Sequence, residues 1–181
     1  MFNPICSRTA AAAVVLLAST LPARIAMAAD APPATGIGAI HAYAGTWKIE
    51  IDHLDTPYSK AGHDSSTLHN DCWESGPYLA CRQIVDGDSK VLLVFTCNGD
   101  HDCTSYQIPP HGADPGAGKL TLDGKTWTFP WQITESGKTT WFRVVNVWSS
   151  PTTIEYRQEY STNQTHWTPT ATGHETKIAQ P

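Results

Sequence analysis

Residues 45–53 read GTWKIEIDH, and this stretch decides the fold. Every second residue from Trp47 to His53 is aromatic, aliphatic or histidine, and charged residues alternate with them. A period of two is typical of a strand that buries one face and exposes the other. The sequence therefore predicts a strand over this stretch, in a sheet with one face turned to water.

The same alternation recurs later in the chain, at residues 127–133 and 154–160. Turn signals such as Asp86-Gly87, Asp123-Gly124 and Ser136-Gly137 separate the alternating stretches by a few residues. Short turns between alternating stretches indicate antiparallel neighbours. We therefore predict an all-β fold, an antiparallel up-and-down barrel of about eight to ten strands, with a β-sandwich as the alternative.

Gly45-Thr46-Trp47 resembles the Gly-x-Trp motif that opens the calycins, the lipocalin-like barrels. Together with the late segments at residues 127–131 and 142–147, the chain resembles small secreted bacterial lipocalin-like proteins of unknown function. The resemblance covers residues 43–178. It implies that Trp47 closes one end of the barrel and packs against an arginine from a late strand.

The first 28 residues have the pattern of a signal peptide. Arg8 precedes an apolar run at residues 10–21, and Ala26-Met27-Ala28 fits a cleavage site after Ala28. The run is too short to span a membrane, and Cys6 lies ahead of it, which excludes the usual lipid anchor. We expect a soluble periplasmic or secreted protein without a membrane anchor, with a flexible lead-in at residues 29–40 and one domain at residues 41–181.

Charge and cysteine content narrow the class of protein. The chain holds 12 Lys and Arg against 17 Asp and Glu, a formal net charge of −5, which argues against a nucleic-acid or anionic-membrane partner. An even number of cysteines after the signal peptide predicts two disulfides in an exported chain. Four cysteines can form two disulfides in three ways. We favour the connectivity in which each bond flanks a turn-like stretch, and a zinc site is the rival interpretation. The favoured pairs are Cys72–Cys81 and Cys97–Cys103.

Arg143 is the first candidate ligand-binding residue. If residues 149–152 form a four-residue loop, Arg143 faces inward together with Tyr156 and Tyr160. It then either packs on Trp47 as a structural cation–π contact or anchors the polar head of a small anionic or amphipathic ligand. A change of one residue in that loop would turn Arg143 to water.

His53 and His174 form the second candidate site. Both fit the predicted inward face, and the first and last strands pair when a barrel closes. Two neighbouring imidazoles would suit a metal ion, and one would suit haem iron. The alternative is a pair of rim histidines that bond to backbone or water, and we expect no cofactor.

No motif of a known enzyme class occurs, so an enzyme is not favoured. The leading hypothesis is a barrel that binds a small apolar or amphipathic ligand, because many aromatic residues fall on predicted inward faces. The alternatives are a protein-binding module, such as an exported hydrolase inhibitor that inserts the loop at residues 109–118, and a filled structural barrel. The predicted inward aromatic residues are Trp47, Trp127, Phe129, Trp131, Trp141, Tyr156 and Tyr160. The predicted ligand-binding residues are Trp47, His53, Trp131, Arg143, Tyr156, Tyr160 and His174.

Overall fold

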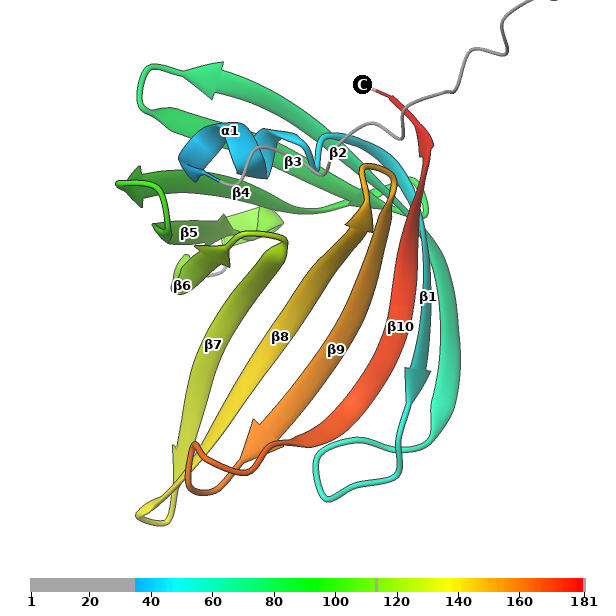
Figure 1. Cartoon of the computed structure of the whole chain (residues 1–181), viewed down its shortest axis with the longest axis vertical. Coiled ribbons are helices and arrows are strands. Elements are labelled where there is room, and N and C mark those ends of the chain that lie inside the picture. The colour runs from blue at the N-terminus through cyan, green and yellow to red at the C-terminus, as the bar shows by residue number, and fades with distance from the viewer. Residues whose placement is uncertain (1–34, 113, 181) are drawn as a thin grey trace, which may run out of the picture.

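Ten strands form the closed barrel that the alternating stretches predict. Each strand pairs in antiparallel fashion with its neighbours in sequence, and β1 closes the barrel against β10 (Figure 1). The up-and-down barrel is confirmed, and the β-sandwich alternative is wrong. The strands are β1 (Gly45–His53), β2 (Gly62–Ser75), β3 (Tyr78–Val85), β4 (Asp88–Asn98), β5 (Asp102–Ile108), β6 (Gly116–Asp123), β7 (Thr126–Glu135), β8 (Lys138–Ser150), β9 (Thr153–Ser161) and β10 (Thr168–Ala179).

The computed structural model describes residues 35–112 and 114–180. The predicted signal peptide at residues 1–28 therefore lies outside the described residues, as does the first part of the predicted lead-in. Within the described ranges, no helix is long and apolar enough to cross a membrane. A short 3₁₀ turn, η1 (Pro110–Gly112), occupies part of the predicted loop at residues 109–118, and β6 begins before that loop was expected to end.

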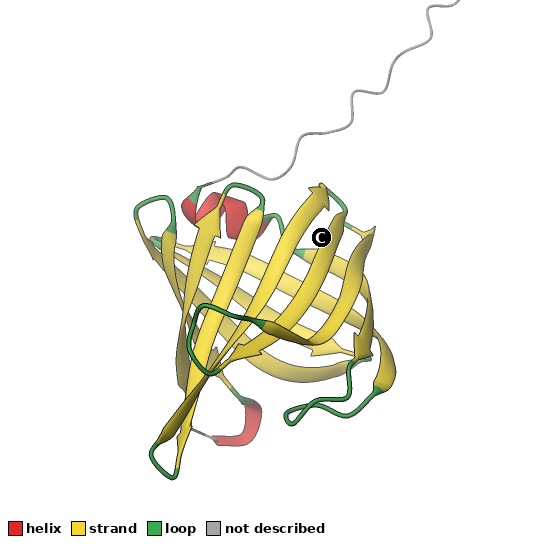
Figure 2. Ribbon diagram, turned by 60° about the horizontal axis from the view of Figure 1, so that its bottom comes forward, coloured by secondary structure: helices red, strands yellow, loops and turns green. Residues whose placement is uncertain are grey.

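A short helix, α1 (Gly36–His41), covers one end of the barrel (Figures 1 and 2). The prediction of a lead-in up to residue 40 is therefore wrong from Gly36 onward. Ala39 and Ile40 are 0% and 2% exposed because they point into the barrel. The Gly36 amide donates to the Asp100 carbonyl at 2.8 Å, which ties the start of α1 to the β4–β5 turn. We call this end the plugged end, and the opposite end, beyond the β1–β2 and β7–β8 connections, the open end.

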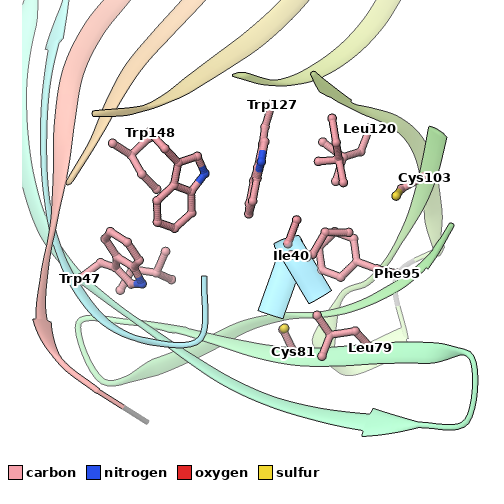
Figure 3. Packing of buried hydrophobic residues seen from close by; sticks show 13 residues of the cluster. Ile40, Trp47, Leu79, Cys81, Phe95, Cys103, Leu120, Trp127 and Trp148 are labelled. Atoms are coloured by element: carbon pink, nitrogen blue, oxygen red, sulfur yellow. The ribbon is translucent and has the colours of Figure 1, made fainter. Parts of the chain in front are cut away.

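Three tryptophans form the centre of the core beneath α1 (Figure 3). The ring centroids of Trp47 and Trp148 are 5.5 Å apart, and those of Trp127 and Trp148 are 5.1 Å apart. The cation above Trp47 is Lys177, with its Nζ 4.9 Å from the ring centroid, so the expectation of an arginine there is wrong. Other members of this core are Ile40, Leu68, Leu79, Phe95, Leu120, Leu122 and Ile154.

Two disulfides link neighbouring strands on their inward faces. Cys72 and Cys81 are direct partners on β2 and β3, and Cys97 and Cys103 are direct partners on β4 and β5. The favoured pairing is confirmed, and the zinc interpretation of these cysteines is wrong. The bonds indicate that the chain folds in an oxidising environment.

The turn between β8 and β9 is shorter than the predicted four-residue loop. β8 continues to Ser150, which pairs with Thr153, and a β-bulge lies between Trp148 and Ser150. The bulge shifts the pairing by one residue, and such a shift exchanges the two faces of a strand. Arg143 consequently pairs with Glu159 on the outer face of the barrel.

Candidate functional site

The inward residues are fully buried near the plugged end of the barrel and only half-buried toward the open end. Toward the plugged end, Trp47, Trp127 and Trp148 are at most 2% exposed. Farther along the same strands, inward side chains such as Ile51, Phe129 and Val144 are only half-buried. Inward residues that are only partly buried indicate that this half of the barrel is less densely filled than the plugged end. The candidate site is therefore the lumen between the tryptophan core and the open end.

The boundary between the two halves holds a buried polar pair. The hydroxyl of Tyr43 donates to Oε2 of Glu175 at 2.5 Å, across 132 residues of sequence. Glu175 lies on β10 opposite Ile49 and Ile154, so its side chain points inward, and it is 4% exposed. The pair forms the floor of the lumen.

Three side chains from different strands hold Tyr43 in place. The Trp47 indole N–H and the Asn70 side-chain amide donate to the Tyr43 carbonyl, at 2.9 and 3.2 Å. The Lys177 Nζ donates to the preceding carbonyl, that of Ala42, at 2.8 Å. The segment that follows α1 is thus fastened to β1, β2 and β10, and this fixes the tyrosine hydroxyl at the carboxylate.

Burial controls the protonation of this floor. Desolvation raises the pKa of Glu175 from 4.5 to about 7, against the opposing effect of the Tyr43 hydrogen bond. Desolvation and the nearby Glu175 charge raise the pKa of Tyr156 to about 12, and burial with the same charge raises that of Tyr43 well above its ordinary value. Both tyrosines therefore remain neutral hydrogen-bonding groups, while the carboxyl group changes its charge near neutral pH.

Two polar atoms on the inner face of β8 have no hydrogen-bond partner within the part of the chain that the structure describes. Asn146 is 6% exposed, and its Oδ1 is buried with no hydrogen-bond partner among the described residues. It pairs with Trp127 and Tyr156, so it points inward between them. Trp148 Nε1 is likewise buried and has no hydrogen-bond partner among the described residues. A buried polar group without a partner costs about 1–3 kcal/mol, and such groups mark places where a ligand or water completes the hydrogen bonds.

Aromatic side chains surround the open end of the lumen. Tyr58, from the β1–β2 connection, packs against Phe142 and Tyr160 with ring centroids 5.1 and 4.7 Å apart. Its hydroxyl lies 3.1 Å from the Thr140 hydroxyl. Trp131 stacks on Phe142 at 5.4 Å. A cleft of about 880 Å³ lies here between the Tyr58 segment and the β7–β8 hairpin, so Tyr58 occupies the entrance of the lumen.

The two candidate histidines do not meet. His53 pairs with the buried Ala171 and faces inward, where its Nε2 lies 2.8 Å from Asp64 Oδ2. His174 pairs with Glu50 and is exposed on the outer face, so the prediction that both histidines face inward is wrong for His174. In residues 35–112 and 114–180, no three His, Cys, Asp or Glu side chains lie close enough to hold a metal ion.

Arg143 also lies outside the lumen. Its Nε donates to Oε2 of Glu159 at 2.6 Å, and its guanidinium lies 4.0 Å from the ring centroid of Trp167. Arg157 makes a second 2.6 Å contact with the same carboxylate. Glu159 is 6% exposed beneath these groups. The predictions that Arg143 anchors a ligand inside the barrel or packs on Trp47 are therefore wrong, and it fastens the β9–β10 connection instead.

The remaining predicted residues occupy different levels of the barrel. Tyr156 and Tyr160 face inward, and Trp131 lies at the entrance with 39% of its surface exposed. Trp47 is part of the filled core. Trp141, predicted to face inward, pairs with Gln132 and Ser161 on the outer face.

The functional candidates that sequence reasoning missed are Tyr43, Tyr58, Asn146 and Glu175. For Glu175 a signal existed: Ala171 and Gly173 precede it in the same phase. Small residues at alternating positions fit the crowded inner face of a barrel, as at Gly173, where an added Cβ would lie 2.1 Å from the Glu50 carbonyl oxygen.

Comparisons with known proteins assign no family to the chain. No protein-family model matches the chain, and no curated protein matches it. Among solved structures, the chain is similar to one described as EF1p2_mFAP2b bound to DFHBI, with 14% sequence identity and a TM-score of 0.34. The similarity covers 77% of this chain and 96% of that one.

Proposed function

We propose that this chain is a periplasmic or secreted protein that binds a small apolar or amphipathic ligand in the lumen of its barrel. The observation that carries the proposal is the accessible surface on inward apolar side chains of the open half, such as Ile51, Phe129 and Val144. Apolar walls with a few buried polar groups are typical of small-molecule sites, and barrels of this kind hold such ligands. The two disulfides and the predicted signal peptide support an extracytoplasmic location.

A brominated long-chain alcohol tests this function, because bromine quenches tryptophan fluorescence on contact and the alcohol carries no charge. We expect saturable quenching on titration, because the alkyl chain would enter the lumen between Trp131 and the core tryptophans. A competing unlabelled alcohol should reverse the quenching.

Two matched substitutions on β8 locate the binding site. Val144→Trp places an indole in the lumen and should reduce the affinity at least about tenfold, because it removes the space for the alkyl chain. Val147→Trp places the same indole on the outer face, where Val147 is 36% exposed, and should leave the affinity unchanged. Absence of saturable quenching, or equal affinities of the two variants, would overturn the proposal.

A further inference from the structure

The chemistry of the lumen floor indicates which polar group the ligand carries. We infer that the barrel selects amphipathic ligands with a protonated amine, whose ammonium group pairs with Glu175 while the apolar part occupies the open half. This inference rests on the proposed function, and it names the ligand class of the same site.

The first support is the unused hydrogen-bonding capacity of Glu175. Among the described residues, the hydrogen bond from Tyr43 is the one that this carboxylate receives. A carboxylate accepts at about four lone-pair positions, so most of them remain available. Neither Glu175 oxygen is among the fully buried atoms that lack a partner. The free oxygen therefore borders the lumen.

The second support is Asn146, which lies on the strand next to Tyr156. Its Oδ1 is buried and unpartnered, and Tyr156 in turn pairs with Gly173, two residues before Glu175. An ammonium group has three N–H donors in a compact head. Glu175 on β10 and Asn146 on β8 therefore both offer acceptors on the inner face of the barrel, on the two strands that flank β9.

The distribution of charge inside the barrel favours a cation. The groups around Glu175 are Tyr43, Tyr156 and Lys177, and the Nζ of Lys177 is held by the Ala42 carbonyl above Trp47. At the rim of the open end, Asp64 lies in the inward phase beside His53, with 75% of its side chain exposed. A ligand that enters from the open end would pass the Asp64–His53 pair at the rim, and Glu175 is the carboxylate at the floor.

The raised pKa of Glu175 is consistent with this arrangement. Burial raises the pKa of Glu175 to about 7, because no neighbouring cation stabilises the ionised carboxylate. An ammonium group supplies that cation, and a ligand carboxylate would instead add a second negative charge to the floor. The basic side chain first expected to bind an anionic ligand, Arg143, lies outside the lumen.

Three probes of equal chain length test the inference: dodecylamine, dodecanol and dodecanoate, each used to displace the brominated alcohol at about pH 8. We expect the amine to bind at least about tenfold more tightly than the alcohol. A charge-assisted hydrogen bond contributes about twice the free energy of a neutral one. Dodecanoate should bind more weakly than the alcohol.

Glu175→Gln should abolish the preference for the amine and keep the affinity for the alcohol, which also shows that the variant is folded. Glu155→Gln removes a carboxylate from the exposed outer face of β9 and should keep the preference. At about pH 5.5, protonation of Glu175 should reduce the preference of the wild-type protein and leave Glu175→Gln unaffected.

The outcomes separate the inference from the proposed function. Equal affinities for amine and alcohol, or an amine preference that survives Glu175→Gln, would overturn the inference and leave lumen binding intact. Absence of saturable quenching by the brominated alcohol, together with no binding of any of the three probes, would overturn both.

Discussion

The plugged end and the open end of the barrel use the same kind of side chain for different purposes. Trp127 and Trp131 lie four residues apart on the inward face of β7, yet Trp127 is 2% exposed and Trp131 is 39% exposed. The difference arises because α1 inserts Ile40 into the core beside Trp127 at the plugged end (Figure 3), whereas Trp131 lies at the entrance. The comparison separates residues that stabilise the barrel from residues that remain available to a ligand.

The largest expected effect comes from truncating this pair of tryptophans. Trp127→Ala should lower the free energy of unfolding by about 3–5 kcal/mol, because it leaves a cavity in a filled core. Trp131→Ala should cost about 1 kcal/mol, because much of its surface is already in water. Urea denaturation of the two variants checks this. Equal losses would show that the open half is as well packed as the plugged half.

A smaller effect is expected at the boundary between the halves. The pKa of Glu175 is about 7 in the folded chain, above its ordinary value of 4.5, so the folded state prefers the protonated form. Its penalty on stability is absent below about pH 4.5, grows as the pH rises toward 7, and is complete above that. Glu175→Gln should therefore be more stable than wild type by about 2–3 kcal/mol at about pH 8, with no such gain at about pH 4.

Denaturation at several pH values measures this difference, and Glu155→Gln is the control because its carboxylate is exposed. Parallel stability curves for wild type and Glu175→Gln would show that the carboxyl group is hydrated in the folded chain. The boundary between a dry plugged half and a wet open half would then lie closer to α1.

The smallest effect on stability is expected at the entrance. Tyr58→Ala should change the free energy of unfolding by less than about 1 kcal/mol, since Tyr58 is 47% exposed. It should nevertheless speed dissociation of the brominated alcohol several-fold, because it removes the side chain that packs across Phe142 and Tyr160. Stopped-flow fluorescence measures the rate. Tyr78→Ala is the matched control, with the same 47% exposure next to the β2–β3 turn; an equal change there would argue against a role for Tyr58 as a lid.

Alternation, turn signals and the Gly-x-Trp resemblance predicted the barrel, and the cysteine count and the turns between the cysteines predicted both disulfides. Residues 45–53 alternate cleanly because only one face is buried, and each cysteine pair flanks a short turn between antiparallel strands. These features depend on local pattern alone, which is why sequence reasoning found them.

The candidate site was harder to predict because β8 is apolar on both faces. Phe142, Val144 and Trp148 alternate with Trp141, Val145 and Val147, so no pattern chooses the inward set. The bulge after Trp148 determines which of the two sets faces inward, and the sequence carries no reliable signal for a bulge. Helix α1 is only six residues long, too short for a helical period to appear.

The hydrogen bonds that join the start of the domain to its last strand have a consequence for how the chain folds. Tyr43 contacts Glu175 across 132 residues, and Ala42 contacts Lys177 across 135. Contacts of such long sequence separation raise the contact order and slow folding. During synthesis, residues 42–43 emerge before β10 and cannot make these hydrogen bonds until that strand follows. The N-terminal hairpins can form earlier, but their inner faces remain uncovered until the final strand arrives.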